Sequence, residues 1–374
     1  MKKVLSIIFA FLLTLSALSV TALAEEINPD EAGYIIVTDY INITKEDVSA
    51  DIQQIIDSNP NRTIYFPDGT YNVSSSIFTP ANPQKSVDLR LSNYAVIKAN
   101  EDFEGEAVVR LGGKDAYNDT HTNGSNYSFT GGIIDGSGVT NGISIDSGRE
   151  TKIADVSIKN TVIGIHVKYG ANSGSSDSDI RDCNIIGTGT TDSVGILLEG
   201  YDNTVTNIRI GYIFTGMWIK SAGNSLTNIH PLYYSDYTDY ENSCGFLDEC
   251  GNNTYNYCYS DQHCIAFYNK KGSNVYTDCF AYWYSSNGGR EIAFKCDKWF
   301  NSQVSGANIG FREDTENDLL IQGGLGKGCL DRVLFDAERC GGYWTYEWYI
   351  TGSPLYQLKC FYFSIKRFFE MIFK

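Results

Sequence analysis

Six short segments of this chain share one pattern, in which a small residue is followed by an apolar residue and a charge closes the segment. They lie roughly 20 to 30 residues apart, a spacing typical of repeat architectures. The segments are residues 164–168, 195–199, 216–220, 245–249, 266–270 and 293–297. Their aligned apolar positions are Ile165, Ile196, Met217, Phe246, Phe267 and Phe294. Their final positions alternate in charge at every step: Lys168, Glu199, Lys220, Glu249, Lys270 and Asp297.

These two columns indicate that each segment is a strand lying beside the same segment of the next coil. Parallel strands lie ~4.8 Å apart, so neighbouring charges of opposite sign attract and like charges repel. A second set of strands precedes the first one for one, at residues 155–158, 182–185, 207–210, 228–231, 256–259 and 277–280. We therefore predict an all-β fold, a right-handed single-stranded parallel β-helix. A β-sandwich of short strands is the alternative, but it gives no reason for the aligned charges.

The charge balance of the sequence limits the classes of binding partner. Acidic residues outnumber basic ones by 45 to 29, and the formal net charge is −16. This balance argues against nucleic acid, because proteins bind phosphates mainly through Lys and Arg. It also argues against dominant charge attraction to a polyanionic glycan, with binding of such a glycan by a local basic strip as the alternative. We expect a polysaccharide or oligosaccharide partner, with the oligomeric state left open.

Both ends of the chain differ from its centre. Residues 1–24 combine a basic start, an apolar run and an Ala22-Leu23-Ala24 cleavage site, which predicts a secretory signal peptide and an extracellular protein. No other segment has enough consecutive apolar residues to span a membrane. The predicted β-helix domain covers residues 25–357. The aromatic and basic tail, residues 358–374, is interpreted as a closing helix, with a membrane-surface helix or an altered end as alternatives.

The ten cysteines all follow residue 182, and no C-x-x-C pair suggests a structural zinc site. Their even number in a secreted chain is compatible with disulfides. A large solenoid does not need such bridges, however, and cysteine packs well as a small interior residue. We interpret Cys183 as a core residue and leave a Cys258–Cys279 disulfide as an alternative.

An amphipathic helix is predicted at residues 44–58, with Thr44 as its N-cap. Its apolar positions are Val48, Ile52, Ile55 and Ile56. A strand, a Pro-Asp-Gly turn and a second strand follow at residues 62–73. The open end of a β-helix exposes unpaired backbone and an apolar interior, so we expect this helix to cap the N-terminal end of coils that span about residues 62–325.

The helix of residues 51–57 and the strands of residues 63–73 resemble the N-terminal part of the pectate-lyase-like superfamily of right-handed β-helices. The similarity is greatest to its polygalacturonase-related, rhamnogalacturonase-like and epimerase-like branch, and residues 223–232 and 251–261 resemble coils of that branch. It covers roughly residues 34–325. The resemblance implies the fold and a polysaccharide-active protein. It implies no catalytic residue, because the Asn-Thr-Asp, Asp-Asp, Gly-His-Gly and Arg-Ile-Lys segments of polygalacturonases are missing, as are the signatures of pectate lyases and alginate epimerases.

Candidate site residues follow from the coil alignment, which places Arg209, His230, Cys258 and Cys279 in one outward column. Acids near His and Arg suit general acid–base catalysis, and aromatic faces bind sugar rings. The predicted catalytic residues are Asp261, His230, Arg209, Asp236 and Asp239, the last two in the long insertion 233–241. The predicted substrate-binding residues are Tyr212, Tyr233, Tyr282, Trp283, Lys220 and Glu249. A structural role for Lys220 and Glu249 in the charge column is the alternative.

No cofactor is predicted. The Asp- and Asn-rich corners leave Ca²⁺ open, but nothing in the sequence fixes a metal site. The predicted function is a secreted enzyme that cleaves glycosidic bonds, as a hydrolase or a lyase, on an outer groove of the β-helix. A non-catalytic glycan-binding or surface-adhesion β-helix is the alternative.

Overall fold

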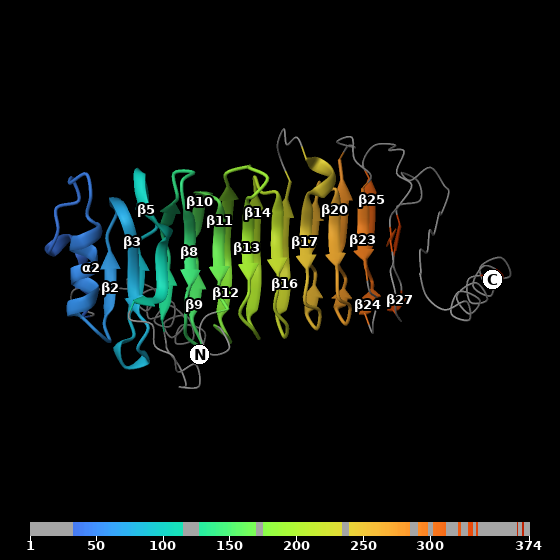
Figure 1. The fold of residues 1–374 in the computed structure, drawn as a ribbon, viewed down its shortest axis with the longest axis horizontal. Coiled ribbons are helices and arrows are strands. Elements are labelled where there is room, and N and C mark those ends of the chain that lie inside the picture. The colour runs from blue at the N-terminus through green and yellow to red at the C-terminus, as the bar shows by residue number, and fades with distance from the viewer. Residues whose placement is uncertain are drawn as a thin grey trace, which may run out of the picture.

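The computed structural model describes residues 33–114, 127–169, 175–233, 239–284, 291–297 and 302–311, with short stretches at 321–322, 328–331 and 334–335 and the single residues 365 and 369. Its strands stack side by side along one long axis, with a helix at the N-terminal end (Figure 1). The predicted signal peptide lies outside the described residues, as does nearly all of the 358–374 tail. No helix among the described residues is long and apolar enough to cross a membrane.

Every pair of neighbouring strands in the described residues is parallel, and each coil has three faces. They are called here the groove face, the ladder face, which carries the charge column, and the third face. The groove face contains β3 (Gly69–Pro80), β5 (Ala95–Lys114), β7 (Ile133–Asp135), β10 (Ser157–Thr161), β12 (Asp179–Gly187), β14 (Thr204–Gly211), β16 (Ser225–Leu232), β19 (Tyr259–Asp261), β22 (Phe280–Trp283), β25 (Asn308–Phe311) and β28 (Leu334–Phe335). The ladder face continues β3 and β5 with β8 (Asn141–Ile145), β11 (Ile163–Val167), β13 (Val194–Leu198), β15 (Thr215–Ile219), β17 (Cys244–Asp248), β20 (Ile265–Asn269), β23 (Ile292–Cys296) and β26 (Ile321–Gln322).

The third face contains β1 (Ile35–Ile36), β2 (Thr63–Phe66), β4 (Asp88–Leu91), β6 (Ser128–Thr130), β9 (Lys152–Ala154), the first halves of β12, β14 and β16, then β18 (Thr254–Asn256), β21 (Val275–Thr277), β24 (Ser302–Ser305) and β27 (Gly328–Asp331). Three short 3₁₀ helices lie at η1 (Val37–Asp39), η2 (Pro83–Lys85) and η3 (Tyr240–Asn242). This arrangement confirms the predicted parallel β-helix.

The N-terminal helix α2 (Ser49–Ser58) covers the end of the stack, as predicted. The four predicted apolar positions are all at most 6% exposed, and they join the main core. The predicted N-cap is wrong, because the helix begins at Ser49. Thr44 instead hydrogen-bonds the Asn42 side chain. Asp47 accepts hydrogen bonds from the backbone N–H of Ser49 at 2.9 Å and of Ser74 at 3.1 Å, which ties the helix start to β3.

The predicted interior column on the ladder face is confirmed residue by residue. Ile165, Ile196, Met217, Phe246, Phe267 and Phe294 pair in register on consecutive strands. All six are at most 1% exposed. The phenyl rings of this column stack with centroids 4.8 and 4.9 Å apart, close to the rung spacing of the sheet.

The predicted charge column also lies on consecutive rungs of the ladder face. Lys220 Nζ lies 3.1 Å from Glu199, and Lys270 Nζ lies 2.7 Å from Glu249, whereas Lys168 pairs with Glu106 and Asp146 of earlier coils. Burial opposes ionisation of Glu249, but Lys270 outweighs it and lowers the pKa. This stabilisation is present at neutral pH, above the unfolded-state pKa, and is lost as the pH falls through the folded-state pKa.

Lys220→Glu places three acids on successive rungs. We expect the melting temperature to fall at low ionic strength by an amount equivalent to about 1 kcal/mol, because exposed like charges at this spacing repel. The loss should shrink in high salt. Lys271→Glu, an exposed corner position with the same charge change, serves as the control. Equal melting curves for both variants at low salt would contradict a contiguous column.

The corner before the groove face holds a stack of Asp and Asn side chains with left-handed backbone. Asn207 donates a hydrogen bond to Asp182 at 2.6 Å, and Asn228 donates to Asn207 at 3.1 Å, as expected for stacked Asx side chains. The left-handed positions on consecutive coils are Asp155, Asp182, Asn207, Asn228, Tyr257 and Asp278. In the last two coils, the sequence alignment is therefore displaced by one residue.

This one-residue displacement reverses the predicted orientation of two cysteine side chains. Because a shift by one residue turns a strand over, Cys258 and Cys279 lie inside the coil and are at most 1% exposed, so their predicted outward orientation is wrong. Both thiols are free, so the alternative disulfide is not formed. Cys183 is buried in the core, as predicted.

Candidate functional site

A compact polar cluster lies on the outside of the groove face, where β16 meets β19. The His230 and Tyr259 rings stack with centroids 4.1 Å apart and planes 18° from parallel. The Tyr259 hydroxyl donates a hydrogen bond to Asp261 Oδ2 at 3.0 Å, and His230 Nε2 lies 3.6 Å from the same oxygen. The side chains of His230 and Asp261 are 23% and 18% exposed, so the cluster is partly desolvated but reachable from solvent.

The period of two along the strands explains this arrangement. Leu232 pairs with Asp261, which brings His230 opposite Tyr259 and puts both on the outer surface. Sequence alignment had paired His230 with Cys258 instead. It missed Tyr259, because Tyr257 rather than Asn256 takes the left-handed corner position, with φ at 51°. An aromatic residue at such a corner gives no signal in the sequence, since Asn and Asp are the residues expected there.

The electrostatics give the three side chains different roles. Burial, reinforced by the Asp261 carboxylate, raises the pKa of Tyr259, which keeps its hydroxyl protonated and donating. Asp261 faces the Nε2 side of the His230 ring. His230 Nδ1 is not engaged by any described residue and remains available to exchange a proton with a bound molecule. The cluster thus contains the parts of a general acid–base site.

Two more predicted residues flank this cluster. Arg209 pairs in register with His230 and is exposed, and Tyr282 pairs with Asp261 on the opposite side. The structure therefore brings together Arg209, His230, Asp261 and Tyr282, as the sequence predicted. Asp239 is exposed and accepts a hydrogen bond from Asn242. Asp236 lies outside the described residues.

The other predicted site residues lie elsewhere. Tyr233 is 3% exposed and packs against Tyr240 and His263, so its predicted stacking on a sugar is wrong. Trp283 is fully buried, because residues adjacent on a strand face opposite sides and Tyr282 is the outward one. Lys220 and Glu249 belong to the ladder face. They are outside the cluster, and their ion pairs fit the structural alternative.

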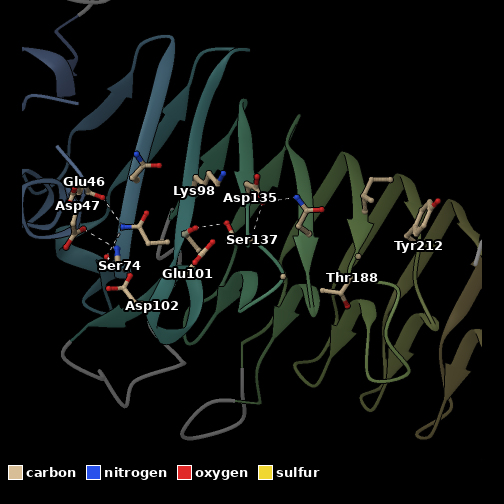
Figure 2. Close-up of a pocket in the computed structure, with 17 residues that line it drawn as sticks. Glu46, Asp47, Ser74, Lys98, Glu101, Asp102, Asp135, Ser137, Thr188 and Tyr212 are labelled. Carbon is tan, nitrogen blue, oxygen red and sulfur yellow. Dashed lines mark hydrogen bonds between the residues drawn. The ribbon is translucent and has the colours of Figure 1, made fainter. Parts of the chain in front are cut away.

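A long groove lies on the same face, toward the N-terminal end. It has a volume of about 1380 Å³ and runs from the loop before α2 to Tyr212 (Figure 2). Most of its lining is polar, and Tyr212, which is 45% exposed, is the one predicted site residue in it. The described lining residues are Glu46, Asp47, Asn72, Ser74, Lys98, Ala99, Asn100, Glu101, Asp102, Asp135, Ser137, Gly138, Asn160, Ile186, Gly187, Thr188 and Tyr212.

The groove and the cluster share one outward column of the sheet. Rung by rung, this column contains Asn72, Lys98, Asp135, Lys159, Ile186, Gly211, Leu232, Asp261 and Tyr282. Tyr212 at the end of the groove follows directly on Gly211. The cluster therefore lies one to two rungs beyond the groove, or about 5 to 10 Å along the axis.

Hydrogen bonds hold the walls of the groove in place. Asn100 bridges the carbonyl of Glu46 at 2.9 Å and the Ser74 hydroxyl at 2.8 Å, which fixes the loop before α2 against the coils. Asp135 Oδ1 accepts from the Ser137 N–H at 2.9 Å and from Asn160 at 3.0 Å. No group of three or more His, Cys, Asp or Glu side chains in the described part of the chain has the geometry to hold a metal ion.

Solved structures of low sequence identity resemble this fold. The catalytic domain of GH87 α-1,3-glucanase, solved with tetrasaccharides, gives a TM-score of 0.54 at 11% identity, covering 87% of this chain and 69% of that one. PfbA, a surface adhesin of Streptococcus pneumoniae, gives 0.52 at 14% identity, covering 86% and 92%. ORF18 of Geobacillus virus E2 gives a TM-score of 0.48 at 14% identity. The match covers 83% of this chain and 64% of that chain, which is less than two thirds of its length.

The first two likenesses show a shared fold between this chain and both an enzyme and an adhesin. No protein-family model and no curated protein matches the chain. The comparisons therefore single out no branch of the predicted superfamily, and the argument for function depends on the groove and the cluster.

Proposed function

We propose that this protein is a secreted, polysaccharide-active enzyme that holds a glycan along the groove face and cleaves glycosidic bonds at the His230–Tyr259–Asp261 cluster. The observation that carries this proposal is the shared column, because an extended chain lying in the groove continues directly over the cluster. Surface grooves of this size suit polymers, since they leave both ends open. Tyr212 and Tyr282 provide aromatic faces on either side of the cluster.

In the proposed reaction, His230 is the group that transfers a proton, through Nδ1, to or from water or the leaving oxygen of the glycan. Asp261 orients the ring from its Nε2 side, where Nε2 and the carboxylate oxygen lie 3.6 Å apart. Tyr259 holds both partners, by stacking on the ring and by its hydrogen bond to the carboxylate. Arg209, one rung away, lies where it can contact a hydroxyl or ring oxygen of the neighbouring sugar.

Binding without cleavage is the second candidate, and one observation favours it. Glycoside hydrolysis usually employs two carboxylates that flank the scissile bond. Among the described residues, Asp261 is the one carboxylate facing His230. A protein that binds glycans for attachment would need the groove and the aromatic side chains but no second acid.

Activity measurements separate these candidates. The protein is incubated with neutral, acidic and amino polysaccharides, and both new reducing ends and the ultraviolet absorbance of unsaturated products are followed. Reducing ends alone indicate hydrolysis, whereas both signals indicate elimination. Binding to any of these polysaccharides with neither signal would contradict cleavage and support the second candidate.

Two substitutions test the cluster on the substrate that is cleaved. His230→Ala and Asp261→Asn should each reduce kcat by about 10²-fold or more, because general acid–base catalysis contributes at least that factor. Asn184→Ala, an exposed position two rungs from His230 in the same column, is the control. Full activity in both cluster variants would place the site elsewhere.

A further inference from the structure

The size and path of the groove define the length of its ligand. Its volume of about 1380 Å³ exceeds the roughly 300–1,000 Å³ of pockets for drug-sized ligands. It crosses the rungs of β3, β5, β7, β10, β12 and β14 before reaching Tyr212. Five rung spacings at ~4.8 Å correspond to about 24 Å. The groove therefore matches several sugar units of an extended chain rather than a single sugar.

The hydrogen-bonding groups of the groove are unequally divided between acceptors and donors. The carboxylates of Glu46 and Glu101 accept no hydrogen bond from a described residue, and Asp135 accepts through Oδ1 but not through Oδ2. Asp102 accepts only a long hydrogen bond of 3.4 Å from Ser74. Two of the three side-chain amides of the lining, those of Asn100 and Asn160, already donate within the groove wall, which leaves Asn72 as the remaining amide donor. The lining thus offers many acceptors and few donors.

The net charge of the groove lining also favours a ligand that donates hydrogen bonds. The described lining contains five carboxylates, Glu46, Asp47, Glu101, Asp102 and Asp135, and one ammonium group, Lys98. Asp47 is engaged by the backbone at the start of α2, but the other four face the groove or its rim (Figure 2). Carboxylate or sulfate groups on a ligand would meet like charge and find few donors. Ammonium groups are donors only and carry the opposite charge.

We propose that the groove binds an amino-sugar polysaccharide, a glycan whose units carry protonated amines. The inference depends on the proposed function in taking the ligand to be a glycan. It adds that the ligand is cationic and at least several units long. The amines would contact Glu101, Asp102 and Asp135, while Tyr212 contacts a sugar face at the end nearest the His230–Tyr259–Asp261 cluster.

Calorimetric titration tests this inference with hexamers of glucosamine, N-acetylglucosamine and galacturonate at mildly acidic pH, where sugar amines are protonated. We expect the glucosamine hexamer to bind most tightly and more weakly at high salt, and the glucosamine dimer to bind at least 10-fold more weakly than the hexamer. In the double variant Glu101→Gln/Asp102→Asn, the Kd for the glucosamine hexamer should rise about 10-fold or more. Glu150→Gln/Asp202→Asn removes two exposed carboxylates at another corner and should leave the Kd unchanged.

The outcomes separate this inference from the proposed cleavage, because binding is measured without turnover. Tight binding of glucosamine oligomers with no cleavage supports the inference and contradicts cleavage. Cleavage of a neutral or acidic glycan, with no preference for the glucosamine hexamer in binding, contradicts the inference and supports cleavage. Tighter binding of the galacturonate hexamer, or an unchanged Kd in the double variant, also overturns the inference.

Discussion

Replacing Asp248 with alanine is expected to lower the free energy of unfolding by about 3 to 5 kcal/mol, because several buried donors lose their acceptor at once. Asp248 ends β17 and is fully buried. Its carboxylate accepts hydrogen bonds from the backbone of Cys250 and Gly251 and from the side chains of Asn253, Tyr255 and Asn274. Alanine leaves the Cys250 and Gly251 N–H groups and the Tyr255 hydroxyl without this acceptor, while Asn253 and Asn274 keep only their other partners, and each such loss is costly.

Denaturant unfolding of the purified variants measures this effect. Asp248→Asn is the informative partner, because it keeps one oxygen for the turn and directs an amide donor at Tyr255 or Asn253. Its loss of stability should lie between those of the wild type and the alanine variant. Asp192→Ala removes an exposed carboxylate and should change little. A loss below about 1 kcal/mol for Asp248→Ala would show that water or rearranged side chains replace the carboxylate.

Asp248 also shows what a periodic pattern cannot reveal. On the neighbouring rungs its interior position is occupied by Ile219 and Asn269. Sequence reasoning identified the columns of Phe246 and Glu249 on either side of it, but gave no reason for a carboxylate inside the coil. The reason is the corner that follows, where Asn203, Asn224, Asn253 and Asn274 are buried and bond to one another along the axis. These Asn residues lie 21 to 29 positions apart in the sequence, so their ladder forms only after the coils stack.

The ladder face was predictable because two constraints act on the same strand. The interior side must be apolar and the outer side carries alternating charge, and both recur on every coil. The second strand set has a weaker pattern, since its outer positions vary freely. Alignment therefore slipped by one residue at Tyr257, and the slip hid Tyr259, the residue that joins His230 to Asp261.

The groove was not predictable from the repeats. Its acidic walls come from the loop before α2 and from the irregular middle of β5, where the register with β3 shifts near Ser75. Residues such as Glu101 and Asp102 read as solvated surface charges in the sequence. They line a groove only because the loop carrying Glu46 and Asp47 folds over the first coils and forms the other wall.

Burial by a loop explains one of the two wrong aromatic assignments, Tyr233, whereas Trp283 faces the inside of the coil because Tyr282 is the outward residue of its strand. Tyr233 follows β16 at an outward-facing end, but η3 returns over it and places Tyr240 at 5.2 Å between ring centroids. The Trp283 indole donates a hydrogen bond to the carbonyl of His263 at 2.7 Å. Strand periodicity describes the sheet, whereas the path of a connecting loop decides which outward positions remain accessible.

Truncating Phe267 to alanine should destabilise the protein by about 3 to 5 kcal/mol, as for other buried phenylalanines. Phe267 is 1% exposed and lies between the parallel rings of Phe246 and Phe294, with Tyr276 edge-on at 5.6 Å. Its removal breaks two stacked contacts at once and leaves a cavity in the middle of the column. Neighbouring coils cannot close this gap, because the backbone ladder fixes the rung spacing.

The strands that lose protection from hydrogen exchange in this variant distinguish a solenoid from a globular core. In a stacked repeat each coil is stabilised mainly by its neighbours, so hydrogen exchange in Phe267→Ala should accelerate most in β17, β20 and β23 and least near α2. Phe267→Leu restores most of the volume without the ring and should recover more than half of the loss. Tyr94→Ala, at a side chain that is 75% exposed, is the control. Uniform acceleration of exchange across all coils would contradict this local coupling and indicate that the described coils unfold as one unit.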